Sequence, residues 1–292
     1  MKKVLAGLVV GVLVIAGAGF VYLDRTSNGI VGFYVWKALS GVETASAHAE
    51  LGNISLYYET FNRRDEGAVP VPVLVLHGGT AFLETMHYQI EALASSRFVI
   101  APDSRAQGRT SDAEGVALSY SLMADDMVAL LDQLGVAKVD IVGWSDGGNI
   151  GLDMAIRYTA RVNRLVMYGS NFHFSGTGGD LSGEPDPEAE QWAAVRSFYQ
   201  DVAVDPAQWP IMLSKVFTMW RDHPTYTVAD LGKIRVPVLV MAGEFDSIED
   251  AHTREMAGAI PGAELLIVEG ADHYAPLMAP DKVNPAMLAF LD

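Results

Sequence analysis

The chain has 292 residues, half of them hydrophobic, which is enough for one large domain with a buried core. It contains no cysteine, so disulfides, thiolate metal ligands, a cysteine nucleophile and a lipid-modified N-terminal cysteine are all excluded. Its formal net charge of −16 argues against nucleic acid and anionic membrane surfaces as partners.

Residues 4–23 are uncharged and mostly apolar, and they follow Lys2 and Lys3. At about 1.5 Å per residue, such a helix would match the ~30 Å hydrocarbon core of a bilayer. One interpretation is a cleaved signal peptide with Ala16 and Ala18 at the cleavage site, which would leave a soluble periplasmic or secreted protein. We favour an uncleaved signal anchor, because the apolar run continues past that site. Either way, the two lysines keep the N-terminus in the cytoplasm, and the body is expected to be exported, at the extracytoplasmic side of the inner membrane if anchored.

A connector, residues 24–46, follows the apolar segment. Its central part, 29–42, could form a short interfacial helix, because Phe33, Tyr34 and Trp36 suit the depth of a membrane interface. The globular pattern begins at about residue 47.

Strands and helices alternate at short spacing through most of the body. The segments 48–51 and 54–60 flank a Gly-Asn turn and predict a hairpin. Short apolar runs then predict buried strands, and apolar residues at helical spacing predict the helices between them. This alternation is typical of a mostly parallel, doubly wound sheet. The predicted strands after the hairpin are 71–76, 98–101, 139–144, 164–168, 236–242 and 264–268, and the predicted helices are 82–94, 119–134, 147–160, 249–259 and 282–291.

Residues 171–235 interrupt this alternation. The segment begins with turn-rich, acidic sequence and continues with helices predicted at 188–201 and 206–221. Because it lies between core segments 47–170 and 236–292, we expect an inserted helical lid over the carboxyl ends of the strands, where such sheets bind ligands. Large apolar residues gather in it, and we expect most to form its packing core and one or two to line an acyl pocket. They are Trp192, Phe198, Tyr199, Trp209, Met212, Phe217, Met219 and Trp220.

Ser145 lies in the pattern Gly143-Trp144-Ser145-Asp146-Gly147, between a predicted strand and a predicted helix. G-x-S-x-G in this context is the nucleophile elbow. Its sharp turn exposes the serine hydroxyl, and a side chain at either glycine would crowd it. The helix that follows points its N-terminus at the serine, which favours a developing oxyanion.

A serine nucleophile needs a base, and the base needs an acid that orients it. Asp246 follows the predicted strand 236–242, and His273 follows the strand 264–268. Both therefore lie at carboxyl ends of strands, on the same edge as Ser145. We predict Ser145, His273 and Asp246 as nucleophile, base and orienting acid.

The rival candidates are placed less well. Five of the seven histidines precede the candidate acid, and His252 lies in a predicted helix, where we expect a surface residue. Glu244 and Asp250 compete with Asp246, but Glu244 lies within the turn and Asp250 in the next helix.

An oxyanion needs two N–H donors. The first should be the amide of Asp146, directly after the nucleophile. The second should come from His77-Gly78-Gly79-Thr80 after the first core strand. We choose Gly79, because a residue without Cβ lets substrate approach the amide, and Thr80 is the alternative. His77 is expected to stabilise this loop.

Two side chains of the elbow are candidates for contact with substrate. The Asp146 carboxylate could bind a cationic group such as an amine, or it could be an acid in the first helical turn, favoured by the helix dipole. We favour the second interpretation. Trp144, on the other side of the nucleophile, is a further candidate. No metal site is predicted.

Several motifs together resemble the α/β-hydrolase superfamily: GWSDGG around Ser145, the glycines after His77, APDSRAQGRTSD, VPVLVMAGEFD and EGADHY. The resemblance runs from about residue 47 to the end, and within the superfamily the chain is similar to the esterase and valacyclovir-hydrolase-like branch. It implies an α/β-hydrolase fold with an eight-stranded sheet, no cofactor and an acyl-serine intermediate. The loop APDSRAQGRTSD departs from the usual family pattern D-x-R-G-x-G-x-S, because Ala106 replaces the first glycine and Thr110 replaces the serine. We expect these replacements to alter the shape of the loop rather than its chemistry.

The sequence therefore predicts a serine hydrolase that cleaves a small to medium carboxylic ester. A lactonase, an amidase or aminopeptidase, or a carbon–carbon bond hydrolase would use the same three residues. Haloalkane dehalogenases and epoxide hydrolases are disfavoured, because their nucleophile is an aspartate. A binding protein on the same fold would have no use for all three groups.

Overall fold

The structure is a computed structural model that describes residues 29–63, 70–179 and 181–292. The chain divides into two units, Met1–Val42 and Glu43–Asp292. In the first unit, the described residues form helix α2 (Ile30–Leu39), within the segment expected to be an interfacial helix. The expected signal segment lies outside the described residues. Among the residues that are described, no helix has the length and apolar character needed to cross a membrane.

The second unit contains an eight-stranded sheet, as the sequence predicts. Its strands lie in the order β1-β2-β4-β3-β5-β6-β7-β8. β1 with β2 and β2 with β4 are antiparallel pairs, and all other neighbours are parallel. The expected mostly parallel α/β-hydrolase architecture is confirmed. The strands are β1 (Thr44–Leu51), β2 (Ile54–Phe61), β3 (Val73–Leu76), β4 (Val99–Pro102), β5 (Val139–Trp144), β6 (Val162–Tyr168), β7 (Val238–Phe245) and β8 (Glu264–Asp272).

The central strands are short apolar runs because both of their faces are covered. Every residue of β3, β4 and β5 is buried. One of these buried residues, Asp140 in β5, is charged. It forms an ion pair of 2.7 Å with Arg97 and accepts a hydrogen bond from Asn163. A buried carboxylate is tolerated here because it is paired.

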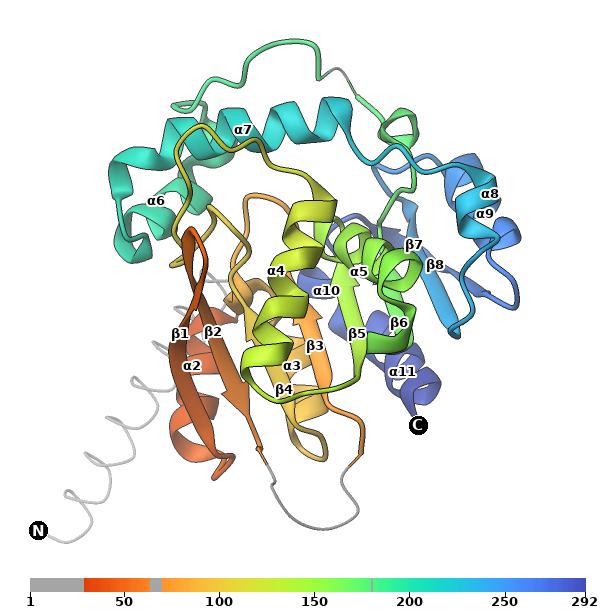
Figure 1. Cartoon of the computed structure of the whole chain (residues 1–292), viewed down its shortest axis with the longest axis horizontal. Helices are drawn as coiled ribbons and strands as arrows, with labels where there is room; N and C mark the ends of the chain where they lie inside the picture. The colour runs from red at the N-terminus through yellow and green to blue at the C-terminus, as the bar shows by residue number, and fades with distance from the viewer. Residues whose placement is uncertain (1–28, 64–69, 180) are drawn as a thin grey trace, which may run out of the picture. The chain divides into compact units, whose positions relative to one another are not determined.

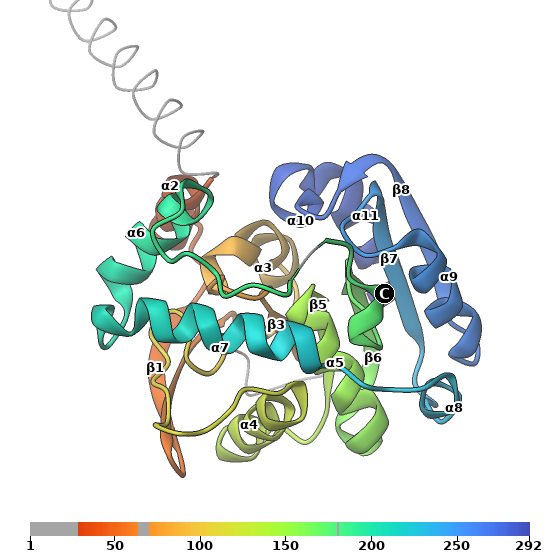
Figure 2. The same cartoon turned by 90° about the horizontal axis from the view of Figure 1, so that it is seen from above.

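Helices cover both faces of the sheet. Figure 2 shows α4 and α5 on one face and α3, α10 and α11 on the other. In α4, the buried residues Met123, Met127 and Leu130 recur at helical spacing, and the Ser119 hydroxyl caps the N-terminus by accepting the N–H of Leu122. The short helix α10 is not among the predicted elements, and the predicted helix 82–94 begins as a 3-10 turn. The elements are η1 (Leu83–Met86), α3 (His87–Ala94), α4 (Tyr120–Gln133), α5 (Asp146–Arg157), α9 (Asp250–Ala259), α10 (Ala275–Met278) and α11 (Pro280–Leu291).

The segment between β6 and β7 forms a helical layer of its own. It contains α6 (Ala193–Val202), α7 (Trp209–Asp222) and α8 (Val228–Leu231), and α7 crosses the end of the sheet at which β5 terminates (Figure 1). Its large side chains mostly pack inward: Tyr199, Trp209, Met212 and Met219 are buried, and Trp192, Phe217 and Trp220 pack against the same core. Phe198 stacks on Phe82 of the body with ring centroids 3.5 Å apart. These residues therefore serve mainly as a packing core.

The expectation that His252 is a surface residue is wrong. Its side chain is buried, and its ring stacks on Phe172 with centroids 4.1 Å apart. Its Nε2 accepts the N–H of Phe172 at 3.2 Å. Burial lowers the pKa of His252, so the ring is held as a neutral acceptor that supports the loop after β6.

Candidate active site

Ser145 occupies the sharp turn between β5 and α5. Its backbone takes φ 54° and ψ −117°, a conformation that a non-glycine residue adopts only under constraint. The constraint comes from tight packing on both sides. A Cβ at Gly143 would lie 2.4 Å from the carbonyl of Gly147, and one at Gly147 would lie 2.2 Å from the carbonyl oxygen of Leu76. The two glycines of the pattern are therefore required by close backbone approach.

Ser145, His273 and Asp246 are brought together in one hydrogen-bonded chain. The Nε2 of His273 lies 3.1 Å from the Oγ of Ser145, and its Nδ1 lies 2.7 Å from Oδ1 of Asp246. The three residues come from the carboxyl ends of β5, β7 and β8. Their proximity follows from parallel strands that end at one edge of the sheet.

The Asp246 carboxylate is almost fully buried and yet favoured as an anion. Burial alone would raise the pKa of Asp246, but the hydrogen bond with His273 and the N–H groups of Ile248 and Gly243 outweigh it and hold the pKa below its ordinary value. An ionised carboxylate accepts a hydrogen bond from Nδ1 and so favours the tautomer that carries its proton there. In the neutral imidazole, Nε2 is then left as the acceptor that faces the serine hydroxyl.

The rival acids lie elsewhere. Glu244 accepts the N–H of Gly270 through Oε2 at an exposed site, and Asp250 pairs with Arg254 one turn along α9. Neither carboxylate shares a hydrogen bond with His273 in the described structure.

Gly169, directly after β6, supports the histidine–aspartate pair and was not identified from the sequence. Its φ is +60°, and a Cβ there would lie 2.8 Å from Nδ1 of His273 and 3.1 Å from Oδ2 of Asp246. A glycine after a strand is too common a signal to single out. Only the fold shows that any larger residue would displace both side chains.

The loop after β3 passes directly beside Ser145. A Cβ on Gly78 would lie 3.4 Å from the Cβ of Ser145. His77 anchors this loop, since its Nε2 accepts the N–H of Ser104 at 2.9 Å and burial lowers the pKa of His77 to about 4, which keeps the ring neutral. Within the part of the chain that the structure describes, the N–H groups of Gly79 and Asp146 donate to no protein acceptor. Both amides are thus available to an oxyanion.

The reason expected for glycine at position 79 is wrong. The space that a Cβ would fill is not open to substrate, because it lies 2.3 Å from the carboxylate of Asp146 and 2.6 Å from the indole of Trp220. Glycine is needed here so that the lid helix α7 and the elbow can both pack against the loop. The neighbouring Thr80 takes a left-handed φ of 60° to complete the turn.

The Asp146 side chain is enclosed, which contradicts its candidate role as a site for a substrate cation. It is 4% exposed, its Oδ1 accepts the Tyr120 hydroxyl at 2.9 Å, and the Trp220 Nε1 donates to both oxygens at 2.9 and 3.0 Å. Burial raises the pKa of Asp146 to about 6 despite these two donors. The carboxylate instead connects the first turn of α5 to the lid.

Trp144 is likewise not exposed to a substrate. Its side chain is 5% exposed, and its Nε1 donates to the carbonyl oxygen of His273 at 2.8 Å. The expected substrate contact is therefore replaced by a contact with the loop that carries the histidine.

The loop of residues 101–112 keeps a left-handed residue at the position of the replaced glycine. Ala106 has φ 67°, the conformation that glycine favours. The Thr110 hydroxyl donates to the carbonyl of Asp103 and accepts the N–H of Tyr57 at 2.9 Å, so it ties the loop to β2. The buried carboxylates of Asp103 and Glu84 share the partly exposed guanidinium of Arg109, which lies over the ring of Phe198 in α6.

Among the described residues, no group of three or more histidine and carboxylate side chains gathers as a set of metal ligands. The groups that do converge are a hydroxyl, an imidazole, a carboxylate and two unengaged amides. Such a set can transfer a proton from an attacking hydroxyl and stabilise a negatively charged oxygen.

Comparisons with known proteins identify the family. Residues 73–286 match the model of the alpha/beta hydrolase family. The chain is 28% identical over 259 residues to an Agrobacterium fabrum protein named "Putative carbamate hydrolase RutD", covering 81% of this chain and 98% of that one. It is 24% identical over 270 residues to the mouse serine hydrolase BPHL, covering 87% and 89% of the two chains. The crystal structure of a hydrolase from Pseudomonas aeruginosa superposes with a TM-score of 0.66 at 25% identity, covering 84% of this chain and 98% of that one. This chain belongs to the alpha/beta hydrolase family.

Proposed function

We propose that the protein is a serine hydrolase that cleaves a small to medium carboxylic ester through an acyl-serine intermediate. The observation that carries the proposal is the hydrogen-bonded chain from the Ser145 hydroxyl through His273 to Asp246, at 3.1 and 2.7 Å. These are the distances at which a base accepts a proton from a nucleophile and an acid orients the base.

In this mechanism the Oγ of Ser145 attacks the ester carbonyl carbon while Nε2 of His273 takes its proton. The carbonyl oxygen becomes an oxyanion, which the amides of Asp146 and Gly79 stabilise. The tetrahedral intermediate collapses with cleavage of the carbon–oxygen bond, and His273 returns the proton to the leaving alcohol. Water, deprotonated by the same imidazole, then releases the acid and regenerates the serine.

Hydrolysis of a carbamate is the second candidate, because the relative that this chain matches over 81% of its length carries carbamate hydrolase in its name. A carbamate presents the same electrophilic carbonyl to Ser145, and the leaving group is then a nitrogen or an oxygen. The same three residues would serve either substrate, so the choice depends on the surfaces around them rather than on the proton transfer.

The test is a panel of matched esters, lactones, carbamates and anilides, measured with the wild type and with Ser145→Ala, on the body from Glu43 onward. We expect the esters to give the highest kcat/KM and the serine variant to lose that activity. Carbamates cleaved a hundredfold better than the matched esters would overturn the ester assignment. Ester turnover that persists in the variant would overturn the mechanism.

We also propose that the apolar segment 4–23 exports the body and holds it at the extracytoplasmic side of the inner membrane. The support is its length and the two lysines before it. Mass spectrometry of the N-terminus of the full chain in membrane and soluble fractions tests this. A mature protein that begins at Gly19 and is found in the soluble fraction would contradict the anchor.

A further inference from the structure

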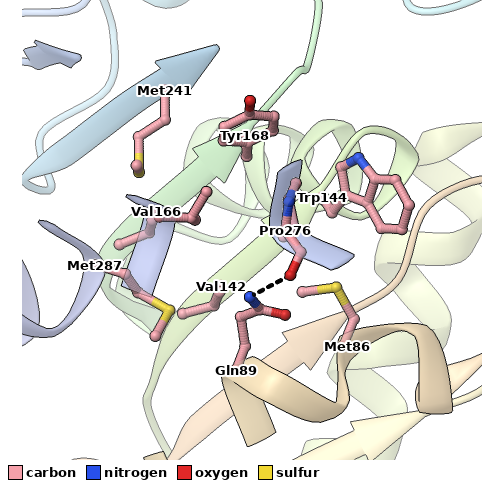
Figure 3. Close-up of a pocket in the computed structure, with 11 residues that line it drawn as sticks. Met86, Gln89, Val142, Trp144, Val166, Tyr168, Met241, Pro276 and Met287 are labelled. Atoms are coloured by element: carbon pink, nitrogen blue, oxygen red, sulfur yellow. Dashed lines mark hydrogen bonds between the residues drawn. The ribbon is translucent and has the colours of Figure 1, made fainter. Parts of the chain in front are cut away.

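Two aromatic side chains that donate hydrogen bonds lie at the ends of neighbouring strands, next to the turn after β8 that carries His273. Trp144 is the last residue of β5 and Tyr168 the last of β6, and the two are direct partners in the register of the sheet. Their rings line one small void together with Pro276 of α10 (Figure 3). Both side chains are therefore on the face of the sheet against which the turn after β8 packs.

The two side chains bond to consecutive carbonyl groups of that turn. The Tyr168 hydroxyl donates to the carbonyl oxygen of Asp272 at 2.7 Å, and the Trp144 Nε1 donates to that of His273 at 2.8 Å. Tyr168 and Trp144 are only 3% and 5% exposed. Both donors are therefore shielded from water, and each bond constrains the position of the backbone.

The His273 imidazole packs beside Gly169 and lies near the rings of Trp144 and Tyr274, whose centroids are 6.1 and 5.7 Å from its own. In the described structure the imidazole is bonded to Asp246 on one side and faces Ser145 on the other. Its location relative to the serine therefore depends on where the backbone of the turn lies. Within the turn, the N–H of Tyr274 bonds to the Asp272 side chain, which shapes the turn but does not tie it to the sheet.

Trp144 is also adjacent to Ser145 in the chain. The end of β5 thus fixes the nucleophile through the backbone and the base through an indole, and the paired end of β6 adds the second bond. Rigid rings with two side-chain torsions hold such a distance with little entropy loss. The Oγ of Ser145 and the Nε2 of His273, which these contacts hold from neighbouring strand ends, lie 3.1 Å apart.

We propose that Trp144 and Tyr168 are positioning residues that hold the turn of His273 in register with Ser145. The inference rests on the proposed role of Ser145 and His273 in hydrolysis. In the described structure neither aromatic side chain hydrogen-bonds to the imidazole or to the serine hydroxyl. The pair therefore acts on the rate of proton transfer mainly through the backbone of the turn, and the Trp144 ring also lies beside the imidazole, with ring centroids 6.1 Å apart.

The test compares Trp144→Phe and Tyr168→Phe with two matched controls. Trp209→Phe removes an indole bond of 2.9 Å to the carbonyl of Pro187, at the far end of α7, and Tyr158→Phe removes a hydroxyl bond to Asp125 at the surface. We expect kcat on a p-nitrophenyl ester to fall by about 10- to 100-fold in each positioning variant, with KM changed less than twofold, because small displacements of reacting groups cost rate. Both controls should keep kcat within about twofold of the wild type, even if their melting temperatures are lower.

A second readout separates positioning from loss of structure. A fluorophosphonate should label the positioning variants slowly but to the same final stoichiometry as the wild type, since the folded sites are all present. The double variant should lose less than the product of the two single effects, because both bonds hold one turn. Tyr168→Phe deletes only an oxygen and keeps the test valid if Trp144→Phe unfolds.

Wild-type kcat in both folded variants, or an equal loss in Trp209→Phe, would overturn the positioning role. So would a loss of labelling stoichiometry that follows the melting temperature. If Ser145→Ala itself retains ester turnover, the proposed function fails instead, and that result is distinguishable because it does not depend on Trp144 or Tyr168.

Discussion

The edge of the sheet that carries Ser145 and the helical layer above it are held by different kinds of contact. At the edge, parallel strands place three loops side by side, and buried backbone and side-chain bonds fix each one. The helices α6 and α7 contact the body mainly through their side chains: Trp220 on Asp146, Lys215 on Asp112 and on the carbonyl of Ala113, and Phe198 on Phe82. Backbone bonds join the inserted segment to the body near its start, between Thr177 and Ile248.

The placement of the three site residues and the packing of the helices that cover them therefore depend on different contacts. Topology determines where Ser145, His273 and Asp246 meet, whereas a few side chains determine how α6 and α7 lie over them. Changes at the edge should therefore reduce the rate with modest effects on stability. Changes at the lid contacts should alter stability and its dependence on pH, with modest effects on the rate.

The largest expected effect is at Asp246. Asp246→Asn replaces the anion that accepts the Nδ1 proton of His273 and favours the wrong tautomer, so kcat should fall by about 10³- to 10⁴-fold. Steady-state kinetics on a p-nitrophenyl ester measures this. Asp250→Asn, which affects a carboxylate paired with Arg254, is the control and should stay within about twofold of the wild type. Similar losses in both variants would contradict the assignment of the acid.

Gly169→Ala should give the next largest effect. The added Cβ would enter the space beside Nδ1 of His273, and alanine disfavours the φ of +60° there. We expect kcat to fall about 100-fold and the free energy of unfolding to fall by about 1–2 kcal/mol. Gly258→Ala, in open space on α9, should leave kcat unchanged and stabilise the protein by about 0.5–1 kcal/mol. A kcat equal to that of the wild type in Gly169→Ala would show that the histidine–aspartate pair tolerates displacement.

The buried carboxylate of Asp146 gives the lid contact a dependence on pH. Burial raises the pKa of Asp146 to about 6, above its unfolded value near 3.8, so the folded state binds the proton more tightly. Its contribution to stability is fully present below about pH 4 and is lost as the pH rises through 6. The wild type should therefore gain about 2 kcal/mol relative to Asp146→Asn between pH 7 and pH 4. Urea denaturation of both proteins at several pH values measures this difference, and parallel stability curves would contradict it.

The smallest expected effect is at Trp220. Trp220→Phe removes the indole donor to Asp146 and should lower the free energy of unfolding by about 1–2 kcal/mol at pH 8, where the carboxylate is charged. At pH 5 the loss should be smaller, because the acceptor is then mostly neutral. The kcat for small esters should change less than fivefold. An equal loss of stability at both pH values would show that the cost comes from packing rather than from the hydrogen bond.

The sequence predicts the sheet and the meeting of Ser145, Asp246 and His273 because both follow from local patterns. An apolar run predicts a strand, and parallel strands place their following loops at one edge. The contacts of Trp144 and Asp146 could not be predicted in this way. Each depends on a residue more than seventy positions away, on His273 for Trp144 and on Trp220 for Asp146.

The same limit explains the roles assigned wrongly or not at all. The loop pattern predicts that glycine at position 79 serves substrate access, but two side chains from other elements fill that space. His252 has the helical spacing of a surface residue, and only the loop after β6 covers it. Tyr168 is the last residue of β6 and Gly169 follows it, and neither carries a distinctive sequence signal. Their contacts are with Asp272 and His273, which lie about a hundred residues further along the chain.

The central claim is that Ser145 is the nucleophile, and covalent labelling tests it most directly. The wild type and Ser145→Ala are treated with a fluorophosphonate, and the modified peptide is identified by mass spectrometry. We predict one label per wild-type chain, on Ser145, and none on the variant. A label that remains in the variant, or a wild type that takes no label, would contradict the account.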